Sequence, residues 1–344
     1  MFRRLSLLLA VIVLASPVHV WAGQGSSDKG ASPTAAPPTK APAPHRPVEN
    51  WGVLKDVKTG LNPMPPFEIQ RDEQPDFVRS LVRLQWRVGD PIDLWIMRPK
   101  STEKVLVVLY LYSYPSETDQ FRDDAWCKRA TAGGFAAVGF VSALTGQRFI
   151  NRPMKEWFVS ELQESLGSSV HDVQLILNYL STQSDLDVTR VGMFGMGSGG
   201  TIALLAAQAD PRISTINVLD PWGDWPRWLR ESPVVPEAQR PKYTTDEFFQ
   251  SLATLDPIAY LPALASRNLR IQQTMTDQVT PKDVKDKFAA AVSDPAQSVK
   301  YADARGLLSA WQNSGLAGWI KQHLRSSTTT ERVAENKPVL ANAQ

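Results

Sequence analysis

A glycine-rich stretch in the middle of the chain constrains its fold more than any other feature. Residues 190–201 read Arg-Val-Gly-Met-Phe-Gly-Met-Gly-Ser-Gly-Gly-Thr. A short apolar segment leads into closely spaced glycines, and the helix-forming run Ile202–Ala209 follows them. The pattern predicts a strand, a sharp turn and a helix, the unit from which sheets of parallel strands covered by helices are built.

Three interpretations of this stretch are open. Gly195 and Gly199 fit the outer glycines of Gly-x-Ser-x-Gly, the nucleophile elbow, and this alignment puts Gly197 where a serine would stand. Gly195, Gly197 and Gly200 also fit the Gly-x-Gly-x-x-Gly fingerprint of dinucleotide sites, with the acidic Asp220 further on. The third interpretation is a glycine-rich turn that only packs. The stretch alone does not choose among them.

The flanking segments predict an alternation of strands and helices. Leu81–Trp86 and Ile92–Met97 are expected to form a hairpin, because both are rich in strand-forming residues and a turn sequence separates them. Further strands are expected at 105–112, 135–141, 190–194, 213–219, 269–275 and 298–301, and helices at 121–131, 170–180, 282–291 and 308–324. This order predicts an α/β fold with a mostly parallel central sheet and helices on both faces.

The position of the stretch and two later motifs favour the elbow. Too few strand–helix units follow it for a dinucleotide-binding domain. Residues 190–200 resemble the R-V-G-x-x-G-x-S-x-G-G motif of the α/β-hydrolase superfamily, near the dienelactone-hydrolase and acyl-peptidase-like esterases. Residues 273–281 are similar to the H-G-x-x-D-x-x-x-P motif of that family, and residues 300–306 fall where it places G-x-x-H-G. The resemblance covers roughly 81–324 and implies an α/β-hydrolase fold with a short lid insertion at about 221–261.

The resemblance implies a catalytic triad at positions 197, 277 and 305, but two of the three side chains differ from the family. The nucleophile position holds Gly197 and the base position holds Arg305, and Asp277 alone matches. Glycine offers no attacking atom, and arginine stays protonated in proteins, so neither residue can perform its step. We therefore interpret the chain as a pseudo-hydrolase that binds a small-molecule ligand or a protein partner. We expect no cofactor and no metal.

Two other functions stay open. Ser198, one residue past the nucleophile position, is the fallback nucleophile of an active esterase or peptidase. A serine at a helix start more often accepts a hydrogen bond from a backbone N–H group. The glycine fingerprint would instead serve a nucleotide-binding reductase.

Five residues are candidates for ligand binding. They are Ser198 and Gly199, through their backbone N–H groups, and Tyr112, Arg305 and Trp222, through their side chains. N–H groups at a helix start attract anions, and a nearby guanidinium would add to this effect. Each side chain also has a structural interpretation, which is an ion pair with Asp277 for Arg305 and core packing for the aromatic residues.

The ends of the chain predict export. Arg3 and Arg4 precede the apolar run Leu7–Ala15 and a small-residue site ending at Ala22, the pattern of a cleaved secretory signal. We expect a signal peptide at 1–22, a disordered tether rich in proline and alanine at 23–50, the hydrolase domain at 51–324 and a polar tail at 325–344. The expected location is the bacterial periplasm or the exterior.

The composition argues against nucleic acid as a partner and against a membrane span in the mature chain. The chain carries 37 Lys and Arg against 35 Asp and Glu, and two of the basic residues lie in the signal. A neutral mature chain without basic runs is not expected to bind nucleic acid. The apolar run of the signal is too short to span a bilayer, so we expect no membrane span after cleavage.

Overall fold

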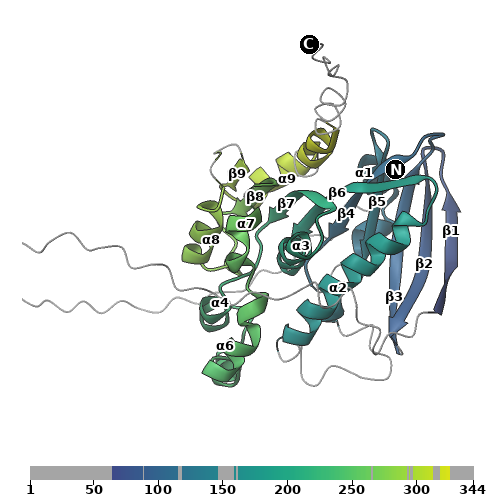
Figure 1. The fold of residues 1–344 in the computed structure, drawn as a ribbon. Coiled ribbons are helices and arrows are strands. Elements are labelled where there is room, and N and C mark those ends of the chain that lie inside the picture. Colours follow the sequence, from purple (N-terminus) through teal and green to yellow (C-terminus); the bar gives the residue numbers. More distant parts are fainter. Residues whose placement is uncertain are drawn as a thin grey trace, which may run out of the picture. The chain divides into compact units, whose positions relative to one another are not determined.

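The computed structural model describes residues 64–87, 89–114, 118–145, 159, 162–264, 266–292, 294, 297–312 and 318–325 (Figure 1). The predicted signal peptide, the tether and residues 326–344 of the predicted tail lie outside these residues. Every described residue belongs to the compact unit His45–Gln344.

The described residues form one nine-stranded sheet with the order β1-β2-β3-β5-β4-β6-β7-β8-β9 (Figure 1). The strands are β1 Met64–Glu73, β2 Phe77–Arg87, β3 Asp90–Pro99, β4 Val105–Leu111, β5 Phe135–Phe140, β6 Leu186–Met196, β7 Ile213–Leu219, β8 Asn268–Thr274 and β9 Ser298–Tyr301. The pairs β1–β2, β2–β3 and β3–β5 are antiparallel, and all the pairs from β5 to β9 are parallel. The carboxyl ends of β4, β6, β7 and β8 therefore meet at one edge.

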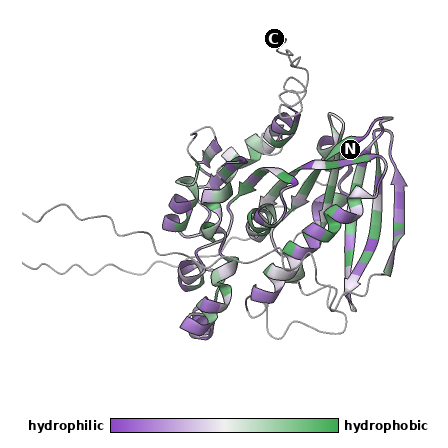
Figure 2. Ribbon diagram, viewed as in Figure 1, coloured by the Kyte–Doolittle hydropathy of each residue, from purple (hydrophilic) through white to green (hydrophobic). Residues whose placement is uncertain are grey.

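The apolar sequences of the central strands account for their burial. The strands β4, β5 and β7 are buried along nearly their whole length, as expected for apolar runs covered on both faces. Figure 2 shows hydrophobic residues concentrated in these strands, whereas β1 at the edge is largely hydrophilic.

Helices cover both faces of the sheet (Figure 1). They are α1 Asp124–Thr131, α2 Leu162–Ser181, α3 Ser198–Ala209, α4 Trp225–Glu231, α5 Arg240–Tyr243, α6 Asp246–Leu252, α7 Leu261–Leu264, α8 Lys282–Ala289 and α9 Ala304–Gln312, with residues 318–325 also helical. One core packs α2 and α3 against the sheet, and a second core packs α1 and residues 318–325 against its other face. No helix among the described residues is long and apolar enough to cross a membrane.

The α/β-hydrolase fold predicted from the sequence is confirmed. The expected hairpin is the pair β2–β3, and the strands at 213–219 and 298–301 have the expected bounds. The segment between β7 and β8 consists of short helices, α4 to α7, where the lid insertion was expected. The helix expected at 308–324 corresponds to α9, which begins earlier, at Ala304, and to the helical residues 318–325, and residues 313–317 lie outside the described residues.

Candidate functional site

The elbow between β6 and α3 has the backbone of a nucleophile elbow but carries no side chain. Gly197 lies between Met196 and Ser198 with φ 55° and ψ −122°, a conformation that residues with a side chain rarely adopt. Its N–H group donates a hydrogen bond to the Leu219 carbonyl at 2.9 Å, which ties the turn to β7. The sharp strand-to-helix turn is therefore present at the position where this fold exposes a nucleophile.

The hydroxyl group of Ser113 lies where the missing side chain would begin. A Cβ atom placed on Gly197 would be 2.4 Å from Ser113 Oγ and 3.4 Å from Trp222 Nε1. Ser113 follows the end of β4, the neighbour of β6 in the sheet. A serine at position 197 would overlap with Ser113 unless one of the two moved.

Ser198 has a structural contact in this fold. Its side chain is fully buried, and its Oγ accepts a hydrogen bond from the Tyr114 N–H group at 3.0 Å. This bond joins the start of α3 to the loop after β4. The two histidines in the described part of the chain lie on other elements, His171 on α2 and His323 against the Trp319 ring at a centroid distance of 4.0 Å.

Asp277 and Arg305, the expected acid and base positions, do not form an ion pair with each other. The Asp277 carboxylate accepts the N–H groups of Val279 and Thr280, both at 3.2 Å, and lies 3.3 Å from the buried Lys285 ammonium. Arg305 is exposed in the first turn of α9. The ion pair that the sequence suggested between Asp277 and Arg305 is thus replaced by a pair with Lys285, which α8 carries into the site.

Asp220, considered in the sequence only for the dinucleotide fingerprint, is a strained and half-buried acid beside the elbow. It follows the last residue of β7 with a positive φ of 47°, and its Oδ1 accepts the Thr274 N–H group at 2.8 Å. Burial raises the pKa of this carboxyl to about 6, and the nearby charge of Asp277 adds to the rise. Such a group titrates near neutral pH, where it can accept or release a proton.

The five candidate ligand residues have different surroundings. Tyr112 points to the face covered by α1, where its hydroxyl accepts a hydrogen bond from Trp126 Nε1 at 2.8 Å. Trp222 is buried against Trp228, with ring centroids 4.9 Å apart, inside the core of the insertion. Gly199 packs so closely on β4 that a Cβ atom there would be 2.2 Å from the Leu111 carbonyl oxygen.

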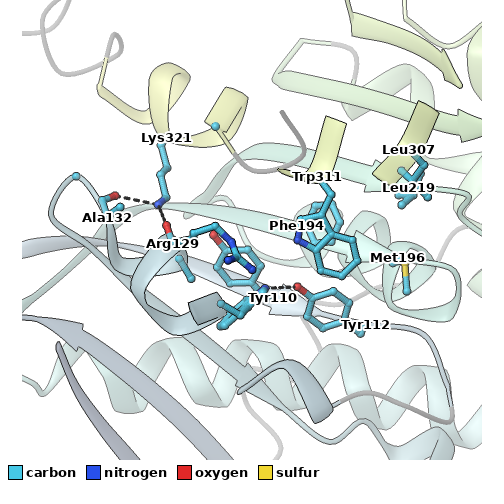
Figure 3. Close-up of a pocket in the computed structure, with 14 residues that line it drawn as sticks. Tyr110, Tyr112, Arg129, Ala132, Phe194, Met196, Leu219, Leu307, Trp311 and Lys321 are labelled. Carbon is cyan, nitrogen blue, oxygen red and sulfur yellow. Dashed lines mark hydrogen bonds between the residues drawn. The ribbon is translucent and has the colours of Figure 1, made fainter. Parts of the chain in front are cut away.

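A cavity of about 310 Å³ lies on the face of the sheet covered by α1 and α9 (Figure 3). The sheet side of the cavity is lined by Tyr110, Tyr112, Phe194, Met196 and Leu219. Helix α1, helix α9 and residues 318–321 supply the other walls. Of the five candidate ligand residues, only Tyr112 lines it. Among the described residues no group of acidic, histidine or cysteine side chains could hold a metal ion.

Fold and elbow together define an α/β-hydrolase scaffold, and comparison with known proteins gives its family. Residues 89–330 match the X-Pro dipeptidyl-peptidase (S15) family, and the chain belongs to that family. No curated protein sequence matches the chain significantly.

Solved structures of esterases share the fold. Acetyl xylan esterase 1 from Thermoanaerobacterium sp. JW/SL YS485 has a TM-score of 0.57 and 17% identity, covering 74% of this chain and 86% of that one. The acetyl xylan esterase from Paenibacillus sp. R4 has a TM-score of 0.54 and 18% identity, covering 75% and 90%. Methylesterase BT1017 has a TM-score of 0.52 and 12% identity, covering 73% and 55%. At these identities the likeness shows the fold and leaves the activity open.

Proposed function

We propose that this chain is an exported, non-catalytic member of its family that acts by binding a small molecule or a protein partner. The observation that carries the proposal is the elbow at Gly197. The turn that should present the nucleophile has kept its backbone conformation, and a neighbouring hydroxyl group occupies the space of the missing side chain.

The hydrolysis reaction of the superfamily requires a nucleophile and a base, and positions 197 and 305 carry neither. A hydroxyl group becomes an effective nucleophile when a base within hydrogen-bond reach takes its proton. Loss of either the serine or the histidine of such a triad lowers turnover by roughly a million-fold. Here Gly197 and Arg305 replace both. A glycine also adopts the positive φ of the elbow without the steric penalty of a side chain, so the scaffold keeps its shape.

The leading alternative is an active serine hydrolase that uses a displaced hydroxyl group. Ser113 is the specific candidate, because its Oγ lies at the mouth of the elbow, and Ser198 is the candidate expected from the sequence. The hydrogen bond from Tyr114 to Ser198 favours an anchoring role for the latter. The nucleotide-binding alternative is not supported, because the Gly197 N–H group is already bonded within the sheet.

Hydrolysis assays separate these functions. Purified chain would be tested with p-nitrophenyl acetate and with an X-Pro p-nitroanilide, the substrate type that the family name indicates. We expect wild type, Ser113→Ala and Ser198→Ala to give the same rate as the buffer blank. A wild-type rate well above that blank, abolished by one of the two alanine substitutions, would establish an active enzyme and identify its nucleophile.

A further inference from the structure

The cavity on the α1 face is adjacent to the elbow. Met196 and Leu219, two of its lining residues, immediately precede Gly197 and Asp220. Strand side chains alternate between the two faces of a sheet, so Met196 points to the α1 face while the elbow opens above the strand ends. A molecule in this cavity would therefore lie next to the elbow without passing through it.

The cavity has an aromatic lining of defined geometry. The ring of Tyr110 packs edge-on to Trp126 with centroids 5.1 Å apart, and Tyr112 packs against Phe194 at 5.9 Å. A dry apolar cavity of about 150 Å³ is enough to bind benzene. At about 310 Å³, this cavity has roughly the volume for a bicyclic aromatic ring system.

One polar group inside this lining has no partner. The Tyr110 hydroxyl is buried and makes no hydrogen bond to any described residue, whereas the neighbouring Tyr112 hydroxyl accepts one from Trp126. Burial raises the pKa of Tyr110, so its hydroxyl stays protonated and can donate. Buried polar groups are nearly always hydrogen-bonded, and this orphan belongs to a residue of the cavity wall, so a ligand atom pairs with it once a small shift of the Tyr110 ring opens its oxygen to the cavity.

The rim of the cavity is positively charged. Arg129 is exposed at the end of α1, and the Lys321 ammonium donates hydrogen bonds to the carbonyl groups of Arg129 and Ala132, both at 2.9 Å (Figure 3). Burial, with Arg325 nearby, lowers the pKa of Lys321 to about 8, which leaves it mostly charged at pH 7. None of the residues that line the cavity is acidic. The rim therefore favours an anionic group on the ligand.

We propose that this cavity binds a hydroxylated aromatic carboxylate of one or two rings. The rings lie among Tyr110, Tyr112 and Phe194, the ring hydroxyl pairs with the Tyr110 hydroxyl, and the carboxylate lies at Arg129 and Lys321. The inference rests on the proposed function, since it gives a non-catalytic chain a ligand and a place to hold it.

Three naphthalene probes test the assignment by calorimetric titration of the folded chain: 6-hydroxy-2-naphthoate, 2-naphthoate and 2-naphthol. Tyr110→Phe should weaken 6-hydroxy-2-naphthoate binding about five- to tenfold, the effect of one hydrogen bond, and leave 2-naphthoate binding unchanged. Tyr179→Phe, the same change on the half-buried Tyr179 of α2, is the matched control and should alter neither. Arg129→Gln should weaken both naphthoates and spare 2-naphthol.

A substitution on helix α9 that fills the cavity with a larger side chain gives an independent test. Leu307→Trp places a larger ring in the cavity wall and should abolish binding, while Leu308→Trp on the exposed side of the same helix should not. Failure of 6-hydroxy-2-naphthoate to bind the folded wild type, or equal binding to Leu307→Trp and Leu308→Trp, would overturn the assignment. That failure differs from failure of the proposed function, because the hydrolysis assays decide the latter whether or not the cavity is occupied.

Discussion

At the residue scale, the Ser113 hydroxyl group occupies the space that a side chain at position 197 would need. The positive φ of Gly197 disfavours any side chain by about 1–2 kcal/mol, and overpacking against the Ser113 hydroxyl adds about 1–3 kcal/mol. We expect Gly197→Ser to lower the free energy of unfolding by roughly 2–5 kcal/mol in urea denaturation. Adding Ser113→Gly should recover the overpacking part. Strictly additive costs in the double variant would show that the two positions do not touch.

Asp220 provides a second residue-scale prediction, in the pH dependence of stability. Its folded pKa of about 6 lies above the usual 3.8, so the unfolded chain loses this proton first as pH rises. The contribution to stability therefore falls between about pH 4 and pH 6 and stays low above that.

The substitution Asp220→Asn removes the charge and keeps an oxygen for the Thr274 N–H group, and asparagine tolerates the positive φ. At pH 7.5 it should raise the free energy of unfolding by up to about 3 kcal/mol, and near pH 4 the gain should disappear. Equal gains at both pH values would contradict burial of a charged carboxylate as the cause.

At the element scale, the tryptophans of the insertion act as its core. Trp225 and Trp228 are fully buried, and Trp225 Nε1 donates to the Leu255 carbonyl at 2.9 Å. We expect Trp228→Ala to cost about 3–5 kcal/mol of unfolding free energy, as for other buried aromatic residues. The half-buried Trp311 of α9 is the comparison, and its replacement by alanine should cost clearly less. Similar costs at the two positions would contradict this view of the insertion.

The sequence predicted most of the strands well but missed one edge strand. The strands β7 and β9 have their predicted bounds. The exposed edge strand β1 was missed, because its two prolines and its charged residues carry no signal of burial. Helix α9 begins earlier than predicted because Asp303 Oδ1 accepts the N–H groups of Arg305 and Gly306, a cap that hydrophobic periodicity does not reveal.

The candidate site was predictable only in part. The elbow at Gly197 could be read from its glycines, since their spacing is local in sequence. Ser113 could not, because its place beside the elbow depends on β4 lying next to β6 in the sheet. Lys285 was missed for a similar reason, since its approach to Asp277 depends on how α8 packs under β8. Contacts between distant segments determine these two neighbours.

At the scale of the whole molecule, we propose that the chain is exported and then works as a binding protein. Expression in a Gram-negative host should give a mature protein that begins near Gly23, measured by the intact mass of the periplasmic fraction. A product that keeps Met1 and remains in the cytoplasm would contradict export. Arg4→Glu together with Arg3→Glu, which removes the positive start of the signal, should reduce processing without changing the mature chain.

The loss of catalysis is the central claim, and active-site labelling tests it most directly. Purified mature chain would be incubated with excess fluorophosphonate, which reacts with activated serines, and its intact mass would then be measured. The account predicts an unchanged mass, because no described serine combines an exposed place at the elbow with a histidine base. Stoichiometric addition of one phosphonyl group, lost in Ser113→Ala or in Ser198→Ala, would contradict it.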